Sequence, residues 1–244
     1  MRRSGMLVHS ILQKLRSMVA DGVSTWDLEV ACAQMIKDAG AKSAFKGYFS
    51  PAAGTKFPCT LCLSLNDEIV HGMASPKKML KAGDVVSLDT GVQLDGYFGD
   101  SATTVAIPPV KPEDEKLLTV TQESLELAIE QSRAGNRLFD ICGTVEKHVV
   151  SNGFSVVREF VGHGIGTSLH EEPQIPNYID RRNDNPRLKE GMVLAIEPMV
   201  LAGKPASKVL ADKWTAVTKD GRNAAHFEHM VAITNNGPWV LTRP

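Results

Sequence analysis

The sequence lacks the long apolar run and the excess of one charge that would identify several common protein classes. No window approaches the ~20 continuous apolar residues that a membrane-spanning helix needs. Lys and Arg number 27, Asp and Glu number 28, and the formal net charge is −1. Nothing in so balanced a composition suggests a surface that binds nucleic acid or a membrane by bulk charge, and neither is an expected partner.

Cysteine is also scarce, since four residues in a chain of 244 cannot form a disulfide framework. Cys59 and Cys62 have the spacing of a redox or zinc pair, but no second pair at ligand spacing accompanies them. We therefore expect thiols that line a pocket individually, and no redox or structural zinc centre.

The N-terminus lacks the features of a signal peptide. The segment after residues 1–3 is interrupted by polar residues, and no small-residue cleavage site follows. Its apolar residues instead recur at helical spacing over residues 7–19, which predicts an amphipathic helix. We expect a cytoplasmic protein.

Helical and strand patterns alternate along the chain in two rounds. The first round has helices over 7–19 and from Ser24 to Gly40, a loop over 41–58, and strands over 60–65, 85–88 and 97–107. The second has helices over 112–133 and 139–151, and strands over 192–196, 213–218 and 228–234. This order predicts an α+β fold with helices on one side of a mainly antiparallel sheet. No low-complexity linker interrupts residues 1–244, so we expect a single domain.

Two aspartates flank a predicted hairpin turn at Asp95-Gly96. Folding the chain at this turn pairs Gly91 with Asp100, and Asp89 then points to the same face as Asp100. The two aspartates become diagonal neighbours roughly 7–8 Å apart at the backbone. Two buried like charges on one face repel each other, and a bound divalent cation removes that conflict. The alternative is that both are solvated turn residues.

Three further residues stand in unusual surroundings. His163 has a glycine on each side in a segment that no phosphate-binding loop matches. Glu197 ends an apolar strand, although glutamate is almost never fully buried without a partner. Glu228 opens a second run of strand formers. With Asp89 and Asp100, these side chains suit Mn(II), Fe(II), Co(II) or Zn(II), and two ions roughly 3.5–4 Å apart.

Seven segments together resemble the bacterial type I methionine aminopeptidase family over residues 5–242, nearly the whole chain. They are Gly22-Val23-Ser24-Thr25, Asn66-Asp67-Glu68-Ile69-Val70-His71-Gly72, the Asp89/Asp100 hairpin, Gly162-His163-Gly164-Ile165-Gly166, His170-Glu171-Glu172-Pro173, Ile196-Glu197-Pro198-Met199 and Phe227-Glu228-His229. The resemblance implies a pita-bread fold, with two pseudo-symmetric halves around a central sheet.

The resemblance also implies residue roles. Asp89 would bind one metal ion, His163 and Glu197 the other, and Asp100 and Glu228 would bridge them. Glu197 would act as the general base, while His71 and His170 would contact the scissile amide and the tetrahedral intermediate. Cys62, Trp214, Tyr48 and Phe57 would lie near the methionine side-chain pocket. The expected substrates are the N-termini of nascent polypeptides, met at the ribosome, and the expected state is a monomer.

The sequence departs from the family pattern at three places. Residues 49–57 form a longer loop, Leu169 replaces a common aromatic residue, and His226 replaces glutamine. No zinc-binding N-terminal extension and no helical insertion of the type II enzymes are visible. Two other readings remain: a proline-directed aminopeptidase of the same fold, and a catalytically silent peptide-binding module.

Overall fold

A computed structural model describes all residues from Met1 to Pro244. The first half contains α1 (Arg2–Met18), α2 (Thr25–Asp38), β1 (Lys42–Ser43), β2 (Phe49–Ser50), β3 (Thr55–Lys56), β4 (Cys62–Leu65), β5 (Glu68–Val70), β6 (Val85–Leu94) and β7 (Tyr97–Ala106). The second half repeats the order of two helices followed by strands. It contains α3 (Pro112–Gln131), α4 (Leu138–Ser151), β8 (Ser155–Val156), β9 (Gly162–Gly164), β10 (Glu171–Ile175), β11 (Val193–Ile196), β12 (Met199–Leu201), β13 (Ser207–Val209), β14 (Ala216–Thr218), β15 (Ala224–His226), β16 (His229–Thr234) and β17 (Gly237–Val240).

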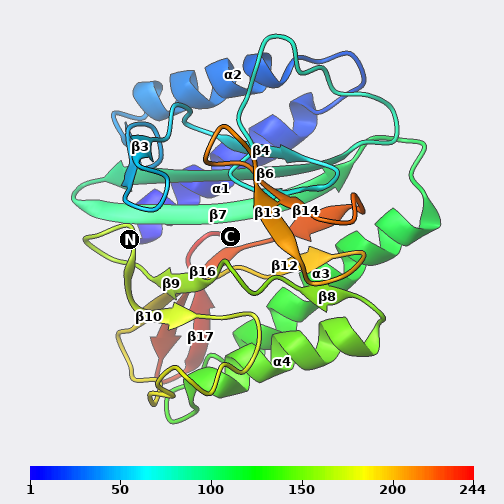
Figure 1. Cartoon of the computed structure of the whole chain (residues 1–244). Helices are drawn as coiled ribbons and strands as arrows, with labels where there is room; N and C mark the ends of the chain where they lie inside the picture. Colours follow the sequence, from blue (N-terminus) through cyan, green and yellow to red (C-terminus); the bar gives the residue numbers. More distant parts are fainter.

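Every strand pairing is antiparallel, which confirms the predicted α+β class. The strands divide among five sheets, and the longest pairing joins β6 to β7. In Figure 1 the strands occupy the middle of the molecule, with α2 above them and α3 and α4 below. None of the four helices combines the length and the apolar character that crossing a membrane requires.

Each helix pair has its own hydrophobic core. In the first half, the apolar faces of α1 and α2 pack on strands β4 and β6, with Ile11, Leu28 and Leu88 fully buried between them. In the second half, α3 and α4 pack on β11, β12 and β16 around residues such as Leu117 and Ile141. Because side chains alternate across a strand, the opposite face of β6 and β7 remains available for polar residues.

The predicted hairpin forms with the predicted register. Asp95 and Gly96 both have positive φ, 52° and 80°, as a two-residue turn of type I′ requires. Gly91 pairs with Asp100 and Leu94 with Tyr97, and no bulge interrupts the ladder. The prediction that two aspartates lie on one face of this hairpin is therefore confirmed.

The predicted loop over 41–58 contains more structure than its sequence indicates. Strands β2 and β3 form a small hairpin whose base is closed by the Phe57 N–H, which donates to the Tyr48 carbonyl at 2.9 Å. Two-residue strands are too short to show an alternating pattern, and the sequence reveals only the turn at Ser50–Gly54. Gly54 donates to the Ser50 carbonyl at 2.8 Å and has a φ of 66°, as that turn requires.

Candidate metal centre

The candidate site forms where strand β7 of the first half meets the second half. The Glu228 N–H donates to the Ala102 carbonyl at 3.0 Å, and the Ser101 hydroxyl donates to the Glu228 carbonyl at 2.6 Å. Asp100 and Ala102 project to the same face, because they are two residues apart on one strand. The isolated bridge between Ala102 and Glu228 thus brings two acidic residues together from positions 128 apart in sequence.

Strand β11 places the histidine and the second glutamate side by side. His163 pairs with Ala195, and Glu197 follows the end of this strand by one residue. The glycines beside His163 are required by this close pairing. A Cβ on Gly162 would overlap the Ala195 carbonyl oxygen, and one on Gly164 would overlap the Glu172 carbonyl oxygen. Both glycines therefore allow strands β9, β10 and β11 to approach one another closely around His163.

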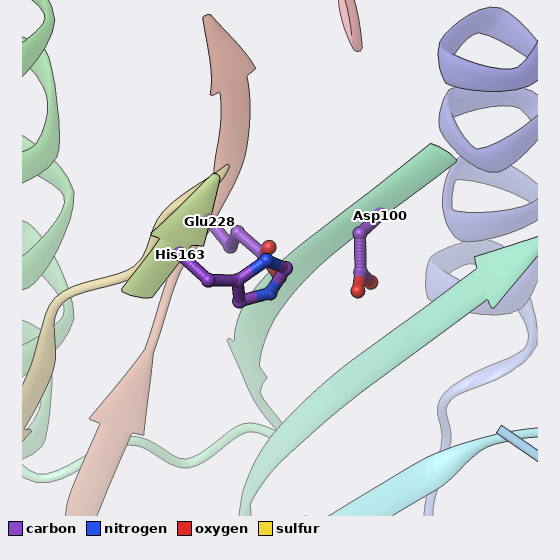
Figure 2. A group of neighbouring side chains, drawn as sticks. All are labelled: Asp100, His163 and Glu228. Atoms are coloured by element: carbon purple, nitrogen blue, oxygen red, sulfur yellow. The ribbon is translucent and has the colours of Figure 1, made fainter. Parts of the chain in front are cut away.

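Three of the five predicted ligands form a tight group. Asp100, His163 and Glu228 are buried, and each offers a donor atom within 4.8 Å of the other two. Figure 2 shows Asp100 on one side, facing His163 and Glu228 on the other. Asp89 and Glu197 lie outside this group but line the same cavity. Both remain close to it, since a Glu197 oxygen is 3.6 Å from His163 Nε2. The charge of Asp100 raises the pKa of Asp89, and the charge of Asp89 raises that of Glu228.

Burial destabilises the charged forms of the four carboxyl groups of the site. Burial raises the pKa of Asp100 to about 7. Burial, reinforced by the neighbouring carboxylates, raises the pKa of Asp89, Glu197 and Glu228 well above the ordinary range. One buried oxygen each of Asp89, Asp100 and Glu228 has no hydrogen-bond partner. Unpaired, repelling oxygens of this kind fit divalent cations, which would neutralise the charge and occupy the free lone pairs.

The tautomer of His163 follows from its backbone contact. Its Nδ1 lies 2.9 Å from the Gly164 carbonyl, which can only accept a hydrogen bond. Nδ1 therefore carries the proton, and the lone pair of Nε2 is free to bind a metal ion. Burial lowers the pKa of His163 to about 4, so the imidazole is neutral near pH 7.

The two remaining predicted histidines line the cavity from different segments. His71 has a φ of 60°, a conformation that costs an L-residue roughly 1–2 kcal/mol. Its ring packs edge-on against Phe160 at 5.3 Å and against Trp214 at 6.2 Å between centroids. Strain held at a residue facing a cavity is a frequent mark of function.

His170 lies next to the metal-binding candidates. Its ring centroid is 4.4 Å from that of His163, in an edge-on arrangement. Its Nδ1 lies 3.0 Å from the Tyr48 hydroxyl. Burial lowers the pKa of His170 below that of a free imidazole. The structure thus brings together all the predicted catalytic residues around one cavity of about 510 Å³.

Three of the four predicted pocket residues form an apolar wall of this cavity. Phe57, Cys62 and Trp214 pack together with Cys59, and the rings of Phe57 and Trp214 meet edge-on at 5.1 Å. Tyr48 also lines the cavity, but 38% of it is exposed and its hydroxyl contacts His170. Phe45 and Met199 line the cavity as well. Neither stood out as a pocket residue, because a single apolar side chain carries no sequence signal of this kind.

His226, a departure from the family pattern, faces the site directly. Its Nε2 is buried without a hydrogen-bond partner and lies 3.6 Å from an oxygen of Glu197. Both its N–H and its carbonyl are bonded to the Thr104 hydroxyl, which fixes its backbone on the first half. Glu197 therefore lies between two imidazoles, those of His163 and His226.

Comparisons with known proteins find one family throughout. The model of metallopeptidase family M24 matches residues 1–235. Methionine aminopeptidase 1 of Bacillus subtilis is 46% identical, in an alignment that covers 100% of this chain and 95% of the relative. The methionine aminopeptidase of Aquifex aeolicus is 45% identical, with coverage of 99% and 94%.

Solved structures give the same result. The crystal structure of methionine aminopeptidase from Thermotoga maritima superposes with a TM-score of 0.94 at 41% identity, covering 100% of this chain and 95% of that one. Prolidase from Pyrococcus furiosus shares the fold, with a TM-score of 0.79 at 21% identity. This chain covers 62% of the length of that prolidase.

Proposed function

Because the chain belongs to metallopeptidase family M24, we propose that it is a metal-dependent aminopeptidase that removes N-terminal methionine when the second residue is small. The observation that carries this proposal is the buried group of Asp100, His163 and Glu228 beside an apolar wall, within one cavity. The names of its relatives support the same activity, since methionine aminopeptidases match this chain over nearly its whole length.

Five side chains would hold two divalent ions. Asp89 would bind one ion, His163 and Glu197 the other, and Asp100 and Glu228 would bridge them. Oxygen and imidazole ligands of this kind accept Co, Mn, Fe or Zn. When bound, such ions polarise a carbonyl and lower the pKa of a water molecule so that it becomes a nucleophile near neutral pH.

The side chains of the chain itself perform the proton transfers. Glu197 accepts a proton as the water attacks the first peptide bond, and it passes this proton to the leaving amine. His71 and His170 donate hydrogen bonds to the amide and to the oxyanion that develops on its carbonyl. Both rings are positioned by packing, since His71 lies between aromatic rings and His170 lies against His163.

The apolar wall accounts for the choice of methionine. Phe57, Cys62 and Trp214 present an irregular apolar surface, which an unbranched thioether side chain fills well. Discrimination against a missing methylene is worth only ~1–3 kcal/mol, so norleucine should be a fair substitute. The second residue of the substrate would lie near His71, where a bulky side chain would collide.

The whole of residues 1–244 would act as one domain, because the proposed ligands come from both halves. The proposed setting is the cytoplasm, with nascent polypeptide N-termini as substrates, met at the ribosome, and with a monomeric enzyme. Neither nucleic acid nor a membrane is a proposed partner.

A panel of short peptides compared by kcat/KM tests the proposed function. Peptides that begin Met-Gly, Met-Ala or Met-Ser should be cut much faster than Met-Lys or Met-Phe. Equal rates for Met-Gly and Met-Phe would contradict the proposed specificity. Faster cleavage before proline in peptides without methionine would favour a prolidase-like activity, and no cleavage of any peptide by metal-loaded protein would favour a silent binding module.

A further inference from the structure

The hydroxyl of Tyr48 makes one hydrogen bond, to Nδ1 of His170 at 3.0 Å. The two rings also meet edge-on, with centroids 5.2 Å apart. Tyr48 was expected in the methionine pocket, yet its polar end is directed to a histidine that the proposed mechanism uses. The contact joins residues 122 apart in sequence, so no local pattern reveals it.

The β2–β3 hairpin determines where Tyr48 lies. The Tyr48 carbonyl accepts from the Phe57 N–H at 2.9 Å, and its own N–H donates to the Phe45 carbonyl at 2.9 Å. The next rung of the hairpin pairs Phe49 with Lys56. Within the turn, Ala53 packs against the apolar cluster that contains Phe57. Tyr48 is therefore held from both sides, by Phe45 before it and by Phe57 at the base of the hairpin after it.

The direction of the hydrogen bond determines the tautomer of His170. A neutral imidazole carries one N–H, and its other nitrogen can only accept. An imidazole nitrogen is a far stronger base than a phenolic oxygen, so the hydroxyl is the favoured donor. When Tyr48 donates to Nδ1, the single ring proton of His170 must reside on Nε2.

We propose that Tyr48 is a positioning residue whose hydroxyl donates to Nδ1 of His170 and thereby keeps Nε2–H available to the reacting carbonyl. The inference rests on the proposed function, because only a reaction with a developing oxyanion needs His170 as a donor. Tyr48, at the base of the β2–β3 hairpin, thus carries the group that sets the protonation pattern of His170.

This role predicts a specific kinetic change. A donor that acts on the oxyanion contributes in the transition state and not in substrate binding, so its loss lowers kcat and leaves KM unchanged. Without Tyr48, His170 would divide between two tautomers, one of which cannot donate from Nε2. The loss of one neutral hydrogen bond corresponds to a fall in kcat of about threefold to tenfold.

The first test is Tyr48→Phe in the metal-loaded enzyme, with a Met-Gly peptide as substrate. The ring and its edge-on contact are retained, so the melting temperature and KM should not change while kcat falls. Phe49→Leu is the matched control, because Phe49 lies on the same hairpin, is 54% exposed and does not line the cavity. An unchanged kcat in Tyr48→Phe, or an equal fall in the control, would overturn the proposal.

The second test observes the tautomer directly by ¹⁵N NMR of the zinc-loaded protein, with His170 assigned by its loss in His170→Gln. The wild type should show the proton on Nε2, and Tyr48→Phe should show a mixture. A proton on Nδ1 in the wild type, or no change in the variant, would overturn the proposal. The tautomer shift in a protein that cuts no methionyl peptide would support the hydrogen bond and refute the proposed function instead.

Discussion

At the scale of single residues, Asp89 and Asp100 of the β6–β7 hairpin should bind metal ions and should not stabilise the metal-free protein. Each has a buried oxygen without a hydrogen-bond partner. We expect Asp89→Ala to lose one ion, and Asp100→Asn to lose one or both, when binding is measured by isothermal titration calorimetry. Asp95→Asn is the control, because Asp95 lies in the exposed turn of the same hairpin. Two ions bound at full strength in both variants would show the site assignment to be wrong.

His71 should be needed for turnover and not for metal binding. It lines the cavity between Phe160 and Trp214 and is absent from the tight ligand group. We expect His71→Ala to retain both ions, as measured by elemental analysis, while kcat falls by about a hundredfold, as the loss of one preorganised oxyanion donor does. A variant that loses its metal, and regains full rate when metal is added, would assign His71 to the ligand set.

The relative positions of site residues could be predicted from the sequence where a local structural rule applied. Asp89 and Asp100 were placed on one face because an Asp-Gly turn fixes the register of a hairpin. The contact between Glu197 and His226 could not be predicted, since the two residues come from segments that meet only in the folded chain. Sequence marked His226 as a departure, but not that its Nε2 faces a carboxylate.

At the scale of elements, strand β9 can reach β11 only because it contains glycines. We expect Gly162→Ala to destabilise the protein by about 1–3 kcal/mol, since the new methyl group overlaps the Ala195 carbonyl oxygen. Metal affinity should fall as well, because His163 follows directly. Thermal denaturation and calorimetry with and without metal measure the two effects.

Helix α4 offers a contrasting glycine. Gly143 lies within this helix, and an added Cβ would meet only the side-chain end of Ile179, which is 41% exposed and can move. Gly143→Ala should leave metal binding unchanged and stabilise the protein by about 0.5–1 kcal/mol. Equal melting temperatures for the two glycine variants would refute the steric argument for β9.

Most long elements could be predicted from the sequence, although the opening helix was expected over 7–19 and is observed as α1 from Arg2 to Met18. Helices α2, α3 and α4 and strands β6 and β7 were found with ends a few residues apart from the observed ones, except that β6 continues to Leu94. Long periodic segments repeat their signal, whereas β2 and β3 have two residues each. Helix α2 begins where the sequence predicts a helix from Ser24, because the Ser24 hydroxyl accepts from the Trp26 N–H at 3.1 Å and caps the helix.

At the scale of the whole molecule, the pKa shifts predict how the metal-free protein depends on pH. The buried carboxyl groups have raised pKa values, that of Asp100 being about 7, so the folded state binds more protons than the unfolded state. Stability should therefore increase as pH falls from about 8 to about 6.5. Below about 6.5 the gain becomes smaller, because buried His163 and His226, with pKa values of about 4 and about 3, stay neutral while unfolded imidazoles take up protons.

Thermal denaturation with a chelator, over pH 5 to about 8.5, measures this dependence. The melting temperature of the metal-free protein should rise as pH falls from about 8 to about 6.5, and more slowly below about 6.5, the pKa of a free imidazole. Added Zn²⁺ or Mn²⁺ should raise the melting temperature most at the alkaline end, since the ions displace the protons held by the carboxyl groups. A metal-free protein whose melting temperature rises from pH 6.5 to 8 would contradict the assignment of buried, unneutralised carboxyl groups.

The bridge between Ala102 and Glu228 has a consequence for how the molecule opens. The Glu228 N–H donates to the Ala102 carbonyl of the first half. The Glu228 carbonyl accepts from the hydroxyl of Ser101, the residue before Ala102. Separating the halves at this point would break the bridge and disperse the ligands in the same event. Exchange of that single amide with deuterated solvent would then slow in step with metal occupancy, so one backbone hydrogen would report how often the ions are free to leave.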